Sequence, residues 1–284
     1  MSFTALALLF ASAVLHTTWN LLLKQAGDKY IATWWGVLIG STLFLPFLFF
    51  TGLPAEQTWG LLLISVLVET AYYITLSRAY SDEDFSLVYP LARGAAPALI
   101  ALWSVLFLGE KLTSGGIFGL IIIISGLLLV GGSSLFQRGG QKFRRRGVSF
   151  ALLLAVLISI YSTIDGAAVK LTPAFSYAVL VFFLSPVLTA PLMFRRYGWP
   201  ILKRELLVER WRLIAIGVLT VGAYLLALGA YAIAPVSYSG AIREVSVVLG
   251  AFAGWRFLGE QLGGWRLAGA VIIFAGIIII ALWG

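Results

Sequence analysis

The chain has 284 residues, of which 61% are hydrophobic and only 11% are charged. Soluble domains are roughly 45–50% apolar and about 25% charged, so this chain has too little charge to cover a water-facing surface of its size. Its net charge is +8, but the basic residues cluster in short segments between apolar runs, a pattern that orients proteins in membranes and argues against nucleic-acid binding. The bilayer is therefore expected to be the main solvent.

Ten apolar stretches reach the ~20 residues that a transmembrane helix needs. In chain order they are residues 2–23, 31–50, 58–79, 86–107, 114–133, 148–169, 174–194, 211–231, 237–257 and 264–283. The first lacks the basic region of a signal peptide, so we expect it to be a retained span. The predicted fold class is an all-α integral membrane protein with ten transmembrane helices.

Positive charge is distributed unequally between the two faces of this arrangement. The segments after the odd-numbered spans hold Lys24, Lys29, Arg78, Arg138, Lys142, Arg144, Arg145, Arg146, Arg195, Arg196, Lys203, Arg204, Arg210, Arg212, Arg256 and Arg266. The opposite face holds only Lys111 and Lys170. Because basic loops remain in the cytoplasm, we expect a multi-pass inner (plasma) membrane protein with both termini on the non-cytoplasmic side.

An internal repeat relates the two halves. The segment FLGEKL at 107–112 recurs as FLGEQL at 257–262, an offset of 150 residues. At this offset Arg93 corresponds to Arg243, Gly119 to Gly269, and Gly126 to Gly276. Since charged residues keep this register, we infer a duplication. Five helices are an odd number, so the second half must be inverted relative to the first, as in many secondary transporters.

The repeat predicts three parts of the chain. Residues 1–133 are expected to form an N-terminal five-helix repeat, residues 134–147 a basic cytoplasmic linker, and residues 148–284 a C-terminal five-helix repeat.

The ten spans, the two halves and the Gly-Glu motif after the fourth and ninth spans resemble the drug/metabolite transporter superfamily, in its EamA-like branch. The segments HTTWN at 16–20 and SLVYPLARGAAP at 86–97 resemble one subgroup of that branch, sometimes found near phosphonate-utilisation genes. This resemblance implies a central cavity, alternating access, a small-molecule substrate and no ATP-hydrolysing domain.

Two arginines lie inside predicted spans, where an ionisable group is costly unless it is paired or hydrated. Arg93 and Arg243 each lie roughly 10 Å from the face where their span begins, at 1.5 Å per residue. The two spans begin at opposite faces, so these arginines are expected on either side of the midplane. They can bind a carboxylate or phosphate of a substrate, or form structural ion pairs with Glu244 or Glu69.

Three acidic residues are further candidates. Glu69 is expected near mid-bilayer, where a carboxyl group can bind a proton, contact an amine or pair with an arginine. Glu244 follows Arg243 directly, so the two side chains point about 100° apart on a helix. Asp165, near the outer end of the sixth span, is a candidate for substrate contact or an interfacial residue near Lys170.

Polar and aromatic residues complete the candidate binding site. His16, Trp19 and Asn20 share one side of the first span, where His16 can change protonation and either His16 or Asn20 can hydrogen-bond another helix. Five tyrosines can form a cage for a cationic amine or belong to interfacial belts: Tyr72, Tyr73, Tyr89, Tyr161 and Tyr224.

Other residues are expected to have structural roles. Pro90 and Pro97 predict a bend or hinge in the fourth span, beside Arg93. Gly115, Gly119, Gly264 and Gly269 are expected to allow close helix packing. The two Gly-Glu motifs are expected to cap the turns that follow their spans.

The leading hypothesis is a secondary active transporter of a small polar metabolite, an amino-acid-like zwitterion or an organic amine, with proton coupling. If Glu69 and Glu244 form internal pairs, the remaining charge favours an organic anion such as a phosphonate. The alternative of another class is a non-transporting scaffold or receptor subunit.

The expected partners are a small-molecule substrate, the lipid bilayer and protons, with no nucleic acid, and the chain is expected to be a monomer or homodimer. Cysteine is absent and there is one histidine, so no metal site of the usual Cys or His type is expected. The sequence has no P-loop, HExxH or GxSxG motif, and we expect neither a cofactor nor enzyme activity.

Overall fold

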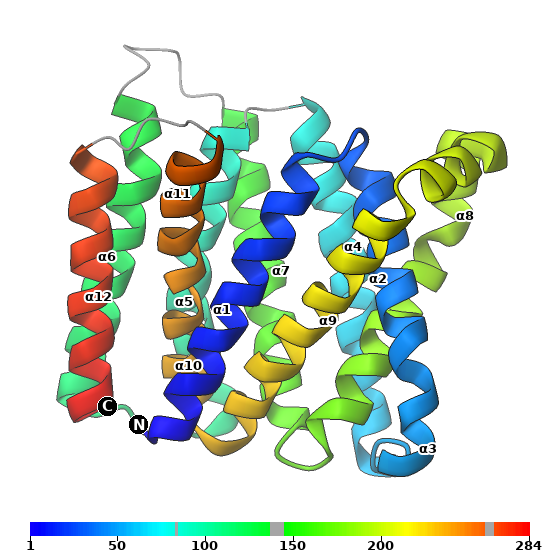
Figure 1. Ribbon diagram of the computed structural model, residues 1–284. Coiled ribbons are helices and arrows are strands. Elements are labelled where there is room, and N and C mark those ends of the chain that lie inside the picture. The colour runs from blue at the N-terminus through cyan, green and yellow to red at the C-terminus, as the bar shows by residue number, and fades with distance from the viewer. Residues whose placement is uncertain (83–84, 137–144, 259–263) are drawn as a thin grey trace.

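The computed structural model describes residues 1–82, 85–136, 145–258 and 264–284, which contain helices and no strand. The helices are α1 (Phe3–Lys24), α2 (Lys29–Phe44), η1 (Leu45–Phe47), α3 (Leu48–Thr51), η2 (Glu56–Thr58), α4 (Trp59–Asp82), α5 (Phe85–Leu108), α6 (Ser114–Phe136), α7 (Arg145–Ala168), α8 (Ala174–Val208), α9 (Arg210–Ile233), α10 (Val236–Arg243), α11 (Val245–Leu258) and α12 (Gly264–Trp283). They form a bundle with both termini at one end (Figure 1). There the amino group of Met1 lies 3.4 Å from the carbonyl oxygen of Ala281.

All ten predicted spans fall on helical segments. Within the described residues, six helical segments are long and apolar enough to cross a bilayer: Phe3–Lys24, Lys29–Thr51, Glu56–Leu76, Gly147–Ala168, Ala174–Val208 and Arg210–Ile233. Parts of α5, α6 and α12 are also apolar, over Ala92–Leu108, Ser114–Val130 and Leu267–Trp283. Outward-facing apolar side chains such as Phe49, Phe107 and Val271 are exposed, as expected where lipid is the solvent. The chain is a multi-pass membrane protein, and the count of ten spans stays a prediction.

Three predicted spans differ from the observed helices. Residues 31–50 are divided among α2, the 3-10 helix η1 and α3. Residues 237–257 are not one helix, because α10 ends at Arg243 and α11 begins at Val245, with Glu244 between them. The span predicted at 174–194 is part of α8, which continues to Val208 across a break at Gly198 (φ 71°, ψ 154°). Glycine adopts this positive φ without a steric penalty, and Pro200 fits the first turn of the helix that resumes after it. The charged segment after residue 194, expected to be a loop, is therefore helical.

The pair α6 and α12 packs closely through glycines that contact one another reciprocally. A Cβ atom on Gly119 would lie 3.0 Å from the carbonyl oxygen of Gly276, and one on Gly126 would lie 2.9 Å from that of Gly269. Because Gly119 corresponds to Gly269 and Gly126 to Gly276, the contacts are reciprocal, as a two-fold axis requires. Gly115 also packs closely, against Trp283. The same expectation is wrong for Gly264, whose Cβ would meet no atom of the described residues within 4 Å.

Contacts between other helices have the same reciprocity. If α1, α2, α4 and α5 correspond to α7, α8, α9 and the α10–α11 pair, three contacts between the halves have a counterpart. The contact between α1 and α9 corresponds to the contact between α7 and α4. The contact between α2 and α9 likewise corresponds to the contact between α8 and α4. Helix α5 packs on α7 as α1 packs on α10 and α11. These contacts agree with an inverted repeat. The boundaries 1–133, 134–147 and 148–284 stay predictions, and residues 137–144 of the linker lie outside the described residues.

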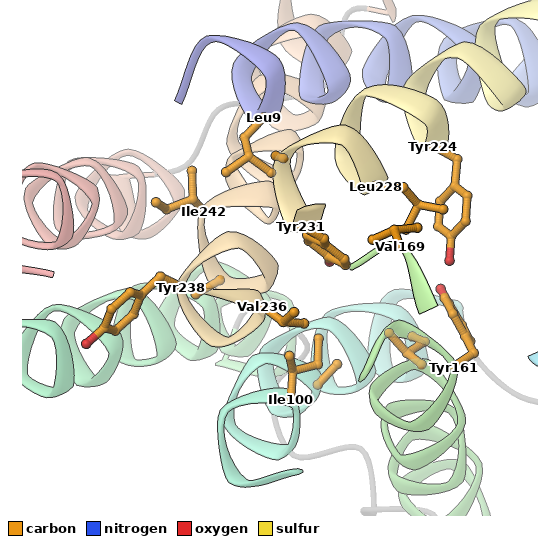
Figure 2. Close-up of a cluster of buried hydrophobic side chains, with 14 of the residues drawn as sticks. Leu9, Ile100, Tyr161, Val169, Tyr224, Leu228, Tyr231, Val236, Tyr238 and Ile242 are labelled. Carbon is orange, nitrogen blue, oxygen red and sulfur yellow. The ribbon is translucent and has the colours of Figure 1, made fainter. Parts of the chain in front are cut away.

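The short helix α10 lies at the centre of the packed interior. All eight of its residues are buried. Figure 2 shows its side chains Val236, Tyr238 and Ile242 among side chains of α1, α5 and α9, including Leu9 and Ile100. Helix α10 contacts α1, α5, α6, α7 and α9, so a movement of α10 would affect several helices at once.

Candidate functional site

Five ionisable residues predicted to lie within the membrane are all buried. They are Glu69 on α4, Arg93 on α5, Asp165 on α7, Arg243 at the end of α10 and Glu244 directly after it. Burying a charge is costly unless another charge or several hydrogen bonds compensate for it. Their partners therefore decide which of them is available to a substrate.

Arg93 and Glu244 form a buried ion pair. Nη1 of Arg93 donates to Oε1 of Glu244 at 2.9 Å, and the two side chains are 8% and 2% exposed. Nη2 of Arg93 lies 3.2 Å from Nε2 of His16, which accepts a hydrogen bond when that nitrogen carries no proton. The ring of His16 also packs edge-on against Trp19, with centroids 5.0 Å apart. Of the alternatives left open for Arg93 and Glu244, the internal ion pair is the one observed.

Arg243 has a different environment. Its guanidinium lies over the ring of Tyr224, 5.8 Å from the ring centroid, and Nη1 lies 3.4 Å from the hydroxyl oxygen of Tyr231. Within the described part of the chain, no carboxylate lies within ion-pair distance of Arg243. The 150-residue offset explains this asymmetry, because the position that corresponds to Glu244 is occupied by Gly94, which has no side chain.

Glu69 and Asp165 accept hydrogen bonds from neutral groups. Oε2 of Glu69 lies 3.4 Å from the hydroxyl of Ser185 on α8. Asp165 accepts a hydrogen bond from the hydroxyl of Tyr177 at 2.8 Å and another from Tyr224. Both carboxyl groups interact electrostatically with Arg243 and with each other. Among the described residues neither has a cation within ion-pair distance, so this side of the cluster has acidic groups available to a ligand.

A row of aromatic rings borders these groups. The ring centroid of Tyr72 lies 5.4 Å from that of Tyr73 and 5.9 Å from that of Tyr161. The ring centroids of Tyr161 and Tyr224 are 6.5 Å apart, and those of Tyr224 and Phe182 are 4.8 Å apart. Figure 2 shows the hydroxyl ends of Tyr161 and Tyr224 directed toward each other. The structure thus brings together four of the five predicted tyrosines, from α4, α7 and α9.

Several buried polar atoms in this region have no hydrogen-bond partner among the described residues. They include Oε2 of Glu244, Nε1 of Trp19, Oγ1 of Thr70 and Oγ of Ser162. Most buried polar groups in proteins are hydrogen-bonded, and each exception calls for a reason. A polar ligand that binds among these helices would supply partners for such atoms.

Some predicted site residues are not part of this arrangement. Asn20 donates to the carbonyl oxygen of His16 in its own helix, at 2.7 Å, rather than to another helix. The side chains of Tyr89 and Pro90 lie outside the described residues. Pro97 is buried within α5, which continues as one helix across it. The backbone break occurs instead at Glu244, in the corresponding span.

Other contacts were missed from the sequence. Ser185, Tyr177 and Tyr231 contact charged residues, and Phe182 contacts Tyr224. Neutral side chains in apolar helices give no signal of such contacts in a single sequence. The Gly-Glu motif at 109–110 also differs from expectation. Its Glu110 carboxylate binds the start of α10 rather than the turn between α5 and α6.

Comparison with known families gives the chain an identity. The model of the EamA-like transporter family matches residues 3–132 and 145–282, which is nearly the whole chain. The chain belongs to the EamA-like transporter family. The resemblance to the EamA-like branch is confirmed, and this EamA-like chain is a multi-pass membrane protein of a transporter family.

Two curated relatives of this EamA-like transporter are distant from it in sequence. The pseudopaline exporter CntI of Pseudomonas aeruginosa strain PAO1 is 23% identical over 191 residues, covering 66% of this chain and 62% of the exporter. The exporter of the same name from strain UCBPP-PA14 matches with the same identity and coverage. The match spans less than two thirds of the length of these relatives. A solved structure, described only as the crystal structure of a protein, matches with a TM-score of 0.79. It covers 99% of this chain and 98% of its own at 19% identity, which shows a shared fold.

Proposed function

We propose that this EamA-like transporter carries a small zwitterionic or amine-containing solute through the central charged cluster by alternating access. One observation carries the proposal. Among the described residues, buried Arg243 has no carboxylate within ion-pair distance, and buried Glu69 and Asp165 have no cation within that distance. Tyr224 contacts both Arg243 and Asp165. A solute with both signs of charge would compensate both sets of groups at once.

The chemistry of each group suggests its role in the complex. The fork of Arg243 suits a carboxylate, to which a guanidinium can donate two parallel hydrogen bonds. An ammonium group would bind Glu69 or Asp165, and the faces of the neighbouring tyrosine rings attract cations. Arg93 and Glu244 would stay bound to each other and position α5 against α10.

An organic anion such as a phosphonate is the second candidate, since a phosphonate also suits an arginine fork. Arg93 is already bound to Glu244, so one arginine would face two acids. Two negative groups near a bound anion would oppose its binding, and the zwitterion or amine is therefore favoured. The relative CntI is named as an exporter, which supports outward transport.

Proton coupling is a further part of the proposal. Glu69 lies deep in the bundle and is 4% exposed, and its carboxyl group accepts a hydrogen bond only from neutral Ser185 among the described residues. A carboxyl group in this setting can hold either a proton or the ammonium group of a solute. Binding of the solute from one side and of a proton from the other would then exchange the two across the membrane.

Ligand-induced stabilisation of the purified protein tests the solute class. The panel contains amino acids, organic amines and phosphonates, each added to detergent-purified protein, because a ligand at 100 times its Kd stabilises a folded state by about 2.7 kcal/mol. Solutes that raise the melting temperature are then tested for saturable flux in proteoliposomes. We expect zwitterions or amines in both sets. If phosphonates alone stabilise the protein, the substrate class is an organic anion rather than a zwitterion or amine. If no solute shows flux, a non-transporting scaffold is favoured.

A further inference from the structure

The first turn of α10 is held by one carboxylate. Oε1 of Glu110 accepts a hydrogen bond from the backbone N–H of Val236 at 2.6 Å. Oε2 accepts two more from Ser237, at 3.1 Å from the backbone N–H and 2.6 Å from the hydroxyl. The N-terminus of a helix favours negative charge, so these are charge-assisted bonds at the favourable end of α10.

Other groups attach to the same place. Nζ of Lys170, which follows α7, lies 3.5 Å from Oε1 of Glu110. The hydroxyl oxygen of Tyr238 on α10 accepts a hydrogen bond from the backbone N–H of Thr113 at 2.9 Å. Gly109 ends α5 with a φ of 65°, which allows the chain to turn so that Glu110 reaches α10. The segment between α5 and α6 thus binds α10 together with the segment after α7, at the end of the bundle where the termini lie (Figure 1).

The other end of α10 reaches the candidate site. Arg243 is its last residue, and Glu244 follows at the break before α11. A helix of eight residues is about 12 Å long, so the two ends of α10 are separated by only about two helical turns. A shift of its first turn would therefore displace Arg243 and strain the ion pair between Arg93 and Glu244.

We propose that Glu110 is a latch that closes the end of the bundle bearing the termini and holds Arg243 in its binding position. Release of the first turn of α10 from Glu110 opens that end, and the break at Glu244 allows α10 to move while α11 stays packed. Glu110 is a positioning residue, since it acts on the site through α10. The role of the latch in transport rests on the proposed function, whereas the contact and its opening do not.

Cysteine labelling tests the latch, and the chain offers a clean background because it contains no cysteine. The reporter is Ser239→Cys on α10, since Ser239 is fully buried and its hydroxyl has no partner among the described residues. Its rate of reaction with a hydrophilic maleimide is measured in nanodiscs, where both faces are accessible. The rate is compared between the reporter alone and the reporter with Glu110→Gln. The matched control is Glu56→Gln, at an exposed acid before α4 at the same end.

We expect Glu110→Gln to raise the labelling rate roughly tenfold, the effect of losing about one charge-assisted hydrogen bond. Lys170→Met should raise it by less, because the three hydrogen bonds of Glu110 remain. A second reporter, Ala32→Cys near the start of α2 at the opposite end, should not label faster. Equal rates at Ser239→Cys in the Glu110→Gln and Glu56→Gln proteins would overturn the latch. So would a rise at both reporters, which indicates general loosening of the fold.

The two proposals fail separately. If no solute in the panel is transported but labelling at Ser239→Cys still depends on Glu110, the latch stands and the substrate assignment is lost. If saturable flux is found and labelling is independent of Glu110, the transport assignment stands and the latch is wrong.

Discussion

Arg93 and Glu244, which are 151 residues apart in the chain, form a buried ion pair at 2.9 Å between α5 and the break after α10. The pair joins the two halves of the molecule. It also removes one arginine and one acid from the groups available to a substrate. Its counterpart is missing because Gly94 occupies the position that corresponds to Glu244, and Arg243 is left for another role.

Removal of one member of this pair should cost more stability than removal of both. Arg93→Met leaves Glu244 buried without its cation, and a buried charge stripped of its partner typically costs about 3–5 kcal/mol. The double variant Arg93→Met with Glu244→Gln should recover part of that loss. Thermal unfolding followed by size-exclusion chromatography measures the difference. Additive losses in the double variant would mean that the two side chains do not stabilise each other.

Arg243→Gln should weaken the binding of solutes that carry a carboxylate more than the binding of solutes that lack one. Loss of a hydrogen bond to a charged group costs about 1.5–3 kcal/mol, so the affinity for a zwitterion should fall by roughly ten- to a hundredfold. An amine of the same shape without the carboxylate should lose little. Competition binding with both solutes measures the two changes, and equal losses for the pair would exclude contact between Arg243 and the carboxylate.

Glu69→Gln should remove the response of transport to a proton gradient. The amide keeps the size of the side chain and a hydrogen-bond acceptor for Ser185, but it cannot carry a proton. Asp165 and Arg243 are the ionisable groups that interact with Glu69, so Asp165→Asn is tested beside it. Flux is measured in proteoliposomes with and without a pH gradient. If Glu69→Gln keeps proton coupling and Asp165→Asn loses it, Asp165 rather than Glu69 is the residue that binds the coupled proton.

Gly126→Ala should destabilise the protein, whereas Gly250→Ala should not. Both glycines lie within helices, where alanine is intrinsically favoured by about 1 kcal/mol. A Cβ on Gly126 would lie 2.9 Å from the carbonyl oxygen of Gly269, and overpacking of this kind costs about 1–3 kcal/mol. A Cβ on Gly250 meets no atom within 4 Å in the part of the chain that the structure describes. Melting temperatures of the two variants, compared in one detergent, provide the test; equal values would show that α6 and α12 separate easily.

A reporter that is fluorescent only in the cytoplasm should be silent when fused to the C-terminus. The two termini lie at the same end of the bundle, so a reporter at either should give the same answer. The segment between α6 and α7 should give a strong signal when it carries the reporter. Fluorescence at the C-terminus would reverse the predicted orientation.

Hydropathy located helices well, because a long apolar run in lipid must satisfy its backbone hydrogen bonds internally. It missed the break at Glu244, since one residue of altered backbone leaves the apolar run unchanged. It also missed the helix after Gly198, where basic and apolar residues alternate too irregularly for a span. Charge inside the predicted spans identified the buried cluster, because such residues are rare and costly there.

The sequence by itself determined the solvent, the helical class, the family and the intramembrane residues that carry charge. These properties depend on composition, on local runs of apolar residues and on the register of a repeat. Tertiary structure alone decided that Arg93 binds Glu244 instead of Glu69, that Arg243 has no such partner among the described residues, and that Glu110 holds α10. Each of these relationships depends on which helices pack together, and partners more than 100 residues apart leave no local pattern in the chain.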